Sequence, residues 1–141
     1  MPHTISSIAA ELESLSASDF DDGQGMQKLS RVCEALERRA DGPELIPLLF
    51  KTMERLRELD LGQPGPLVHT LEHWVGQYEG ELIASLQRQP MYLTVWMVSR
   101  ILNGESRDTR KWKAILRQVI RHPNASQDVK HDAEEYLDNH K

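Results

Sequence analysis

PLVHTLEHWVGQYEGELIASLQRQPMYLTVWMVSRILN, the stretch from Pro66 to Asn103, decides the fold class because it divides into three short helical segments. Gly65-Pro66 opens the first segment, since proline is favoured at the first position of a helix, and Gly76 closes it. The second runs over residues 77–88. Pro90 starts the third, which is apolar on almost every side over residues 91–103 and is therefore expected to be the central buried helix.

The flanking sequence carries the same helical periodicity, and no segment alternates apolar and polar residues as a strand would. Glycine, proline and polar turn residues separate the segments. Ser106 and Ser126 are predicted to cap the two last helices, and Pro47 either kinks the third helix or marks a later start for it. The apolar spacing predicts further helices over residues 5–15, 26–36, 45–56, 112–120 and 129–137.

These segments predict an all-α protein with about eight short antiparallel helices, arranged as stacked helical pairs of the HEAT type or as a compact bundle. Stacked pairs are preferred, because one fully apolar helix among amphipathic ones suits a layered arrangement. A chain of 141 residues has the length of a single domain, which is predicted to span residues 1–141.

The composition gives an acidic chain with a formal net charge of −5. Residues 1–62 contain 7 Lys and Arg against 12 Asp and Glu, whereas residues 63–141 contain 10 of each class. An acidic first half favours a basic partner and disfavours nucleic acid. No membrane-spanning or signal segment is evident, and the lone Cys33 is expected to be a packed core thiol, so a cytoplasmic protein is predicted.

The pentapeptide HTLEH at residues 69–73 resembles an inverted zincin motif, with His69 and His73 one helical turn apart and Glu72 between them. Advancing about 100° per residue from Leu67 places the apolar face near 40° and the two histidines near 200° and 240°. The histidines should therefore point away from the core. A zinc site also needs a third protein ligand and a closed surrounding, so neither metal nor cofactor is expected.

No other motif indicates catalysis, because the sequence has no nucleophile elbow, no phosphate-binding glycine loop and no residue placed to activate Cys33. The protein is therefore expected not to be an enzyme. A basic stripe lies opposite Trp112 and could face phosphates. The favoured interpretation is a solvated basic face, which could also pair with acids of the last helix at Asp128, Asp132 or Glu135. The stripe consists of Arg110, Lys113, Arg117 and Arg121.

Two acidic clusters are the candidate partner-binding residues. The first is the turn after the first helix, and the second surrounds Gly80, where Trp74 and Tyr78 either anchor a partner or pack at a helix junction. Their predicted contact residues are Asp19, Asp21 and Asp22 in the first cluster and Glu72, His73, Tyr78, Glu79 and Glu81 in the second.

The block from Pro66 to Asn103 and the closing segment HPNASQDVKHDAEEYL resemble small all-helical bacterial immunity proteins of polymorphic toxin systems, of the contact-dependent inhibition type. The similarity covers roughly the last 80 residues, and its marks are the Gly-Pro-Leu start, the LTVWM helix and the Pro-Asn-Ala-Ser cap. It implies a protein that neutralises a cognate toxin domain by direct binding. The first 60 residues show no comparable similarity.

The leading hypothesis is an immunity protein that covers the active site of a basic, nuclease-like toxin domain, with acidic helices steering the encounter. One alternative is a helical-repeat adaptor that binds a peptide or nucleic acid through the basic stripe. A small zinc hydrolase using His69, His73 and Glu72 is the third. No membrane partner is expected.

Overall fold

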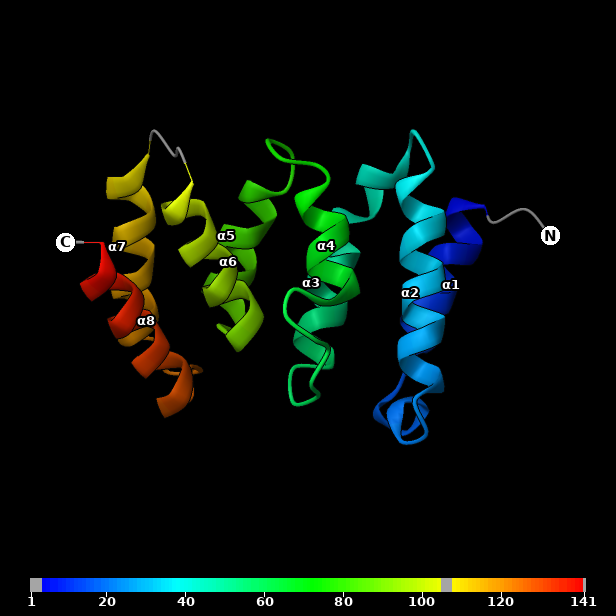
Figure 1. Ribbon diagram of the computed structural model, residues 1–141, viewed down its shortest axis with the longest axis horizontal. Helices are drawn as coiled ribbons and strands as arrows, with labels where there is room; N and C mark the ends of the chain where they lie inside the picture. Colours follow the sequence, from blue (N-terminus) through cyan, green and yellow to red (C-terminus); the bar gives the residue numbers. More distant parts are fainter. Residues whose placement is uncertain (1–3, 105–107, 141) are drawn as a thin grey trace. The chain divides into compact units, whose positions relative to one another are not determined.

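The computed structural model describes residues 4–104 and 108–140, and over these ranges it contains eight α-helices, two short 3-10 helices and no strand (Figure 1). The all-α prediction is confirmed. The contacts divide the chain into two compact units, Met1–Glu81 and Leu82–Lys141, which we call unit 1 and unit 2. The single domain over residues 1–141 and the choice between stacked pairs and a bundle stay predictions.

Unit 1 is built around α2, which packs against α1 and α4, while α3 contacts both α1 and α4. Leucines at helical spacing supply most of its core, and Phe50 and Met53 of α3 are fully buried within it. The elements of unit 1 are α1 (Ile5–Ser14), η1 (Ala17–Phe20), α2 (Gln24–Glu37), η2 (Gly42–Leu45), α3 (Ile46–Arg55) and α4 (Gly65–Glu72).

In unit 2, α6 packs against α7 and α8, and α7 and α8 pack extensively against each other. A hydrogen-bond network joins the end of α5 to the turn after α7: His122 Nε2 lies 2.6 Å from the Gln87 carbonyl oxygen, and Asn124 Nδ2 donates to the Arg88 carbonyl at 3.1 Å. These bonds satisfy carbonyls that the last turn of a helix leaves unpaired. The helices are α5 (Glu79–Arg88), whose first residues belong to unit 1, α6 (Tyr92–Asn103), α7 (Thr109–Ile120) and α8 (Gln127–Asn139).

The predicted helix boundaries hold in part. Ser126 caps α8 as expected, its Oγ accepting the Val129 N–H at 3.2 Å, and Pro47 is the second residue of α3 because the segment Gly42–Leu45 forms a separate 3-10 turn. The predicted cap at Ser106 lies outside the described residues. Asp108 occupies the N-cap position of α7.

Two expectations about burial were wrong. Val75 was placed on the core face of the fourth helix, but α4 ends at Glu72, the chain turns, and the Val75 side chain is 73% exposed. The third helix of the deciding segment, α6, is not buried all round. Tyr92, Trp96 and Arg100 recur every fourth residue along its surface, and the Arg100 guanidinium lies 4.8 Å from the centre of the Trp96 ring.

Candidate acidic interface

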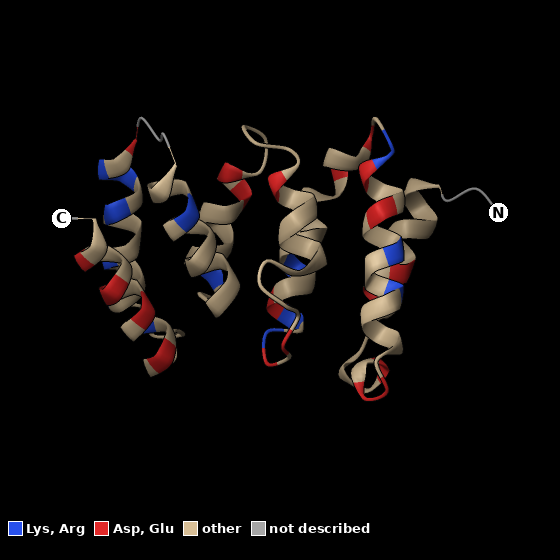
Figure 2. Cartoon of the chain, in the orientation of Figure 1, with Lys and Arg blue, Asp and Glu red and all other residues tan. Residues whose placement is uncertain are grey.

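Charge separates sharply between the two units. Unit 1 contains 7 Lys and Arg against 15 Asp and Glu, a net charge of −8, whereas unit 2 contains 10 against 7, a net charge of +3. Both predicted contact clusters lie in unit 1, where carboxylates outnumber Lys and Arg about twofold. Figure 2 shows acidic residues at the ends of several unit 1 helices.

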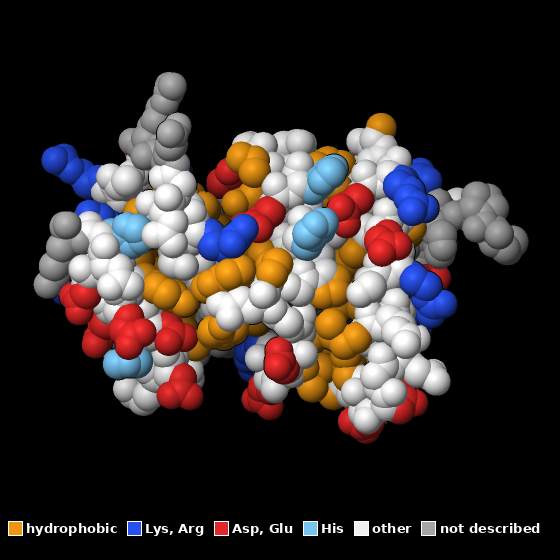
Figure 3. All heavy atoms as spheres, viewed as in Figure 1, with side chains coloured by type: hydrophobic (Ala, Val, Ile, Leu, Met, Phe, Trp, Pro, Cys, Tyr) orange, Lys and Arg blue, Asp and Glu red, His pale blue; other side chains and the backbone are white. Residues whose placement is uncertain are grey.

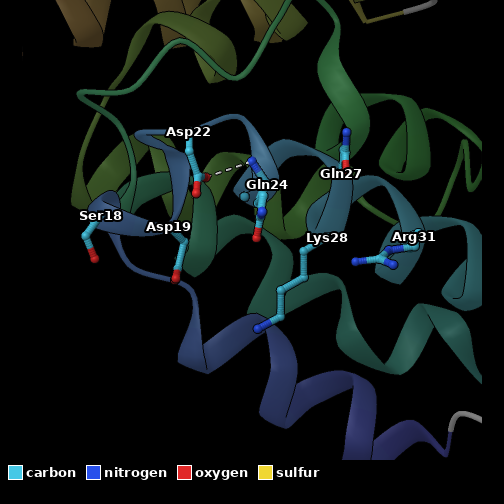
Figure 4. A pocket seen from close by; sticks show the side chains of 8 residues that line it. Ser18, Asp19, Asp22, Gln24, Gln27, Lys28 and Arg31 are labelled. Atoms are coloured by element: carbon cyan, nitrogen blue, oxygen red, sulfur yellow. Dashed lines mark hydrogen bonds between the residues drawn. The ribbon is translucent and has the colours of Figure 1, made fainter.

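The first cluster lies where η1 leads into α2, and two of its carboxylates have local structural roles (Figure 4). Asp19 accepts the Ser16 N–H at 2.8 Å, and Asp22 accepts the Gln24 N–H at 3.1 Å. The backbone hydrogen bond from Ser16 lowers the pKa of Asp19 below its usual value, with further lowering from the Ser16 hydroxyl and Lys28, against a smaller rise from burial. Asp21 is exposed.

Asp19 and Asp22 share a hollow of about 300 Å³ with two cations, Lys28 and Arg31 (Figure 4). Because these carboxylates and cations line the same hollow, their charges partly cancel in the electric field that a distant partner experiences. The first cluster is thus a polar hollow of mixed charge, and it contributes less to steering than the three consecutive acidic positions suggested.

In the second cluster, Tyr78 requires a correction. Its side chain is only 3% exposed, so it packs in the core and cannot serve as a surface anchor. Glu79 fixes the turn before α5, since its Oε2 accepts the Gly76 N–H at 2.9 Å, and its Oε1 is buried without a hydrogen-bond partner. Glu72 and Glu81 are part-exposed.

The structure brings the two histidines of α4 together with a carboxylate that the motif did not include. Glu37, at the end of α2, lies between the helices with its Oε1 3.7 Å from His69 Nδ1 and 3.9 Å from His73 Nδ1. Its Oε2 accepts the hydroxyl hydrogen of the buried Thr70 at 2.9 Å. We call Glu37, His69, Thr70 and His73 the Glu37 cluster.

The Glu37 cluster does not have the geometry of a zinc site. His69 and His73 are 68% and 55% exposed, which confirms that they face away from the core, and Figure 3 shows histidines at the surface over α4. Within residues 4–104 and 108–140, no three His, Cys, Asp or Glu side chains are arranged to hold a metal ion. The histidines and Glu37 form a polar surface with a partly buried negative charge.

Cys33 lies one turn before Glu37 on α2 and is buried, as predicted. Burial raises the pKa of its thiol to about 12, with a smaller opposing effect from Thr70. The thiol is therefore protonated near neutral pH. Because the thiolate is the nucleophilic form of cysteine, the Cys33 thiol is a poor nucleophile in the folded protein.

A groove of about 440 Å³ opens beside the Glu37 cluster, between α2 and the beginning of α4. Its walls combine apolar groups with carboxylates, and no Lys or Arg lines it. We call it the Glu37 groove. Its lining residues are Ser30, Cys33, Glu34, Glu37, Pro64, Gly65, Pro66 and His69.

Sequence reasoning missed a second surface, formed by α6 and α8 in unit 2. Burial and the neighbouring Asp132 raise the pKa of Tyr136, and Tyr92 acts in the same direction. Burial and Glu135 raise the pKa of Asp132, with a smaller opposing effect from His131. The four-residue spacing of Tyr92, Trp96 and Arg100 could have indicated that one face of α6 reaches the surface.

The basic stripe is a solvated face, as expected, and the alternative in which it pairs with α8 does not hold. In the described part of the chain, no ion pair joins Asp128, Asp132 or Glu135 to a cation of α7. Figure 2 shows basic residues along α7 and acidic ones along α8. The stripe is solvated, with Arg110, Arg117 and Arg121 exposed and Lys113 part-exposed.

No protein-family model, curated protein or solved structure is similar enough to this chain to count as a match. In the described ranges, no helix has both the length and the apolar character needed to cross a membrane.

Proposed function

We propose that this chain is a non-enzymatic binding protein whose unit 1 docks on a basic surface of another protein. Following the resemblance of residues 66–137, we further propose that the partner is a cognate toxin domain and that the chain is its immunity protein. Covering the active site of a basic, nuclease-like domain would neutralise it without any chemistry by this chain.

The observation that supports the proposal most directly is the net charge of −8 on unit 1. Residues 58–81 contribute five acidic side chains and no Lys or Arg to this charge. Complementary charge of this kind accelerates encounter and discriminates against wrong partners, while a few desolvated contacts hold the complex. The Glu37 cluster supplies a carboxylate that is already partly removed from water.

Calorimetric titration against the C-terminal domain encoded by the gene immediately upstream tests the proposal. We expect one-to-one binding that is tighter at 50 mM than at 500 mM salt, because salt screens exposed charges. The combined variant Glu72→Gln and Glu81→Gln should weaken binding at low salt. The combined variant Asp128→Asn and Glu134→Gln, which neutralises two exposed carboxylates of unit 2, is the matched control and should change binding little.

Absence of heat at both salt concentrations would contradict the immunity proposal. One observation then favours the adaptor alternative, because the basic stripe makes no ion pair to α8 within the described residues. Its members are Arg110, Lys113 and Arg117 of α7 and Arg121 at the C-cap of that helix. A single-stranded oligonucleotide whose affinity falls steeply with salt would support that alternative.

A further inference from the structure

Glu37 has unused acceptor capacity at a position that is mostly removed from water. Its side chain is 19% exposed, and Thr70 hydrogen-bonds only its Oε2. The imidazole nitrogens of His69 and His73 lie at 3.7 and 3.9 Å from Oε1, beyond hydrogen-bonding distance. A carboxylate oxygen can accept two hydrogen bonds, so Oε1 is open to a further donor.

The Glu37 groove has the chemistry that suits the stem of a long basic side chain. Pro64 and Pro66 give it apolar walls, Gly65 leaves one position without a side chain, and the neutral thiol of Cys33 adds no charge. Glu34, which is exposed, provides a second carboxylate at the same groove. Long cationic side chains bury their methylene stems on apolar surfaces and direct their charged ends to acceptors.

We propose that the Glu37 groove of unit 1 binds an arginine side chain presented by the partner, with Glu37 Oε1 accepting from its guanidinium. Arginine is preferred over lysine because a planar guanidinium can bond carboxylates through several donors while it stacks on a flat group such as the His69 ring. The inference rests on the proposed function only in that a basic protein partner supplies the arginine.

The first test is a titration of the ¹⁵N-labelled full chain with N-acetyl-arginine amide, followed by amide chemical shifts. We expect weak, saturable binding with shift changes confined to residues around Cys33, Glu37, Gly65 and His69. N-acetyl-lysine amide should bind more weakly, and N-acetyl-citrulline amide, which has a similar shape without the charge, should not bind. Shifts spread over all exposed carboxylates, or equal effects of arginine and citrulline, would overturn the proposal.

Substitution at the groove provides the second test. Glu37→Gln keeps an oxygen for the Thr70 hydroxyl but removes the charge, and it should lower the affinity for N-acetyl-arginine amide about tenfold or more. Glu58→Gln makes the same change of net charge at an exposed carboxylate outside the groove and should leave the affinity unchanged. Equal weakening by both variants would show non-specific attraction and contradict a built site.

Ser30→Tyr, which fills the groove from α2 without altering Glu37, covers the case in which Glu37→Gln fails to fold. It should abolish the localised shifts. Titration of the same variants with the upstream-encoded domain separates this inference from the proposed function. If Glu37→Gln binds the upstream-encoded domain as tightly as wild type, the arginine site is contradicted and the proposed function stands. If wild type binds N-acetyl-arginine amide but not the upstream-encoded domain, the arginine site stands and the proposed function is contradicted.

Discussion

At the scale of single residues, burial decides what Cys33 and Glu37 can do. The two lie one helical turn apart on α2, but the thiol is enclosed and neutral, whereas the carboxylate stays reachable from a groove. The sequence predicted the buried thiol from its place between Val32 and Leu36. It could not predict that Glu37 meets His69 and His73, because that contact depends on the packing of α2 against α4, far apart along the chain.

Raising the pH should destabilise the protein through Cys33. Its thiol titrates near pH 9 in the unfolded chain but at about 12 in the folded protein, so above pH 9 only the unfolded state loses the proton. Stability is then lost as the pH rises from 9 toward 12, by on the order of 1 kcal/mol per pH unit. Urea unfolding of wild type and Cys33→Ala at pH 8 and pH 10 measures this.

The comparison isolates the thiol, because lysines and tyrosines titrate in both proteins alike. The wild type should lose more stability than Cys33→Ala over this interval. Parallel losses in the two proteins would contradict the buried-thiol explanation.

Gly42 is predicted to tolerate a side chain poorly. A Cβ at this position would lie 2.6 Å from the Leu36 carbonyl oxygen and 2.7 Å from Cζ2 of Trp74. Gly42→Ala should therefore cost about 1–3 kcal/mol of unfolding free energy, as overpacking typically does. Gly80→Ala is the control, since nothing lies within 4 Å of its Cβ position in α5, and thermal unfolding should show it unchanged or slightly stabilised.

At the scale of elements, the ends of the helices were harder to predict than their existence. Periodicity located every helix in the described ranges, and side-chain chemistry correctly placed the cap at Ser126. Periodicity gave the wrong helix end after Glu72, where the apolar pattern continues through Trp74 and Val75 although the helix has ended. The side chain of Trp74 remains buried because the turn directs it back to the core, whereas the side chain of Val75 is exposed. Sequence periodicity cannot distinguish these two outcomes.

The end of α1 depends on a residue about 40 positions away. The guanidinium of Arg55, in the last turn of α3, donates to the carbonyl of Leu12 at 2.8 Å and to that of Leu15. Both carbonyls lie at the end of α1, where the last turn has few backbone donors, so Arg55 adds donors there. The Leu12 carbonyl also accepts the Leu15 N–H, at a longer 3.4 Å. Arg55→Met should lower the free energy of unfolding by about 1–3 kcal/mol, measured by urea denaturation.

Arg55→Lys keeps the charge but not the fork of donors, so it should recover only part of this loss. Full recovery by lysine would show that charge near the end of α1, and not the paired hydrogen bonds, accounts for the effect.

At the scale of the whole molecule, a net charge of −5 conceals an uneven distribution. Unit 1 carries −8 and unit 2 carries +3, and within unit 2 the cations gather on α7 and the acids on α8 (Figure 2). The sequence predicted the acidic first half and the basic stripe. It could not predict that the stripe and the acids of α8 do not pair, since both helices are amphipathic and only their packing determines which polar faces meet.

The excess charge of unit 1 should oppose its own folding at low salt. Replacing two exposed acids, Glu13→Gln and Glu58→Gln, reduces the repulsion and should raise the urea midpoint, whereas replacing the exposed cations Arg31→Gln and Lys51→Gln should lower it. Each change should be a few tenths of a kcal/mol per charge. Protection of Cys33 from thiol reagents gives a readout located in unit 1.

Both effects should shrink together in 1 M salt, where the Debye length falls to about 3 Å. The mirrored variants make the argument specific to charge, because substitutions that only disturbed local packing would move the midpoint in the same direction. If the acid and cation variants shift the urea midpoint in the same direction, or if salt leaves their difference unchanged, the net charge of unit 1 does not measurably affect its stability. The steering assigned to it would then have to come from individual sites such as Glu37.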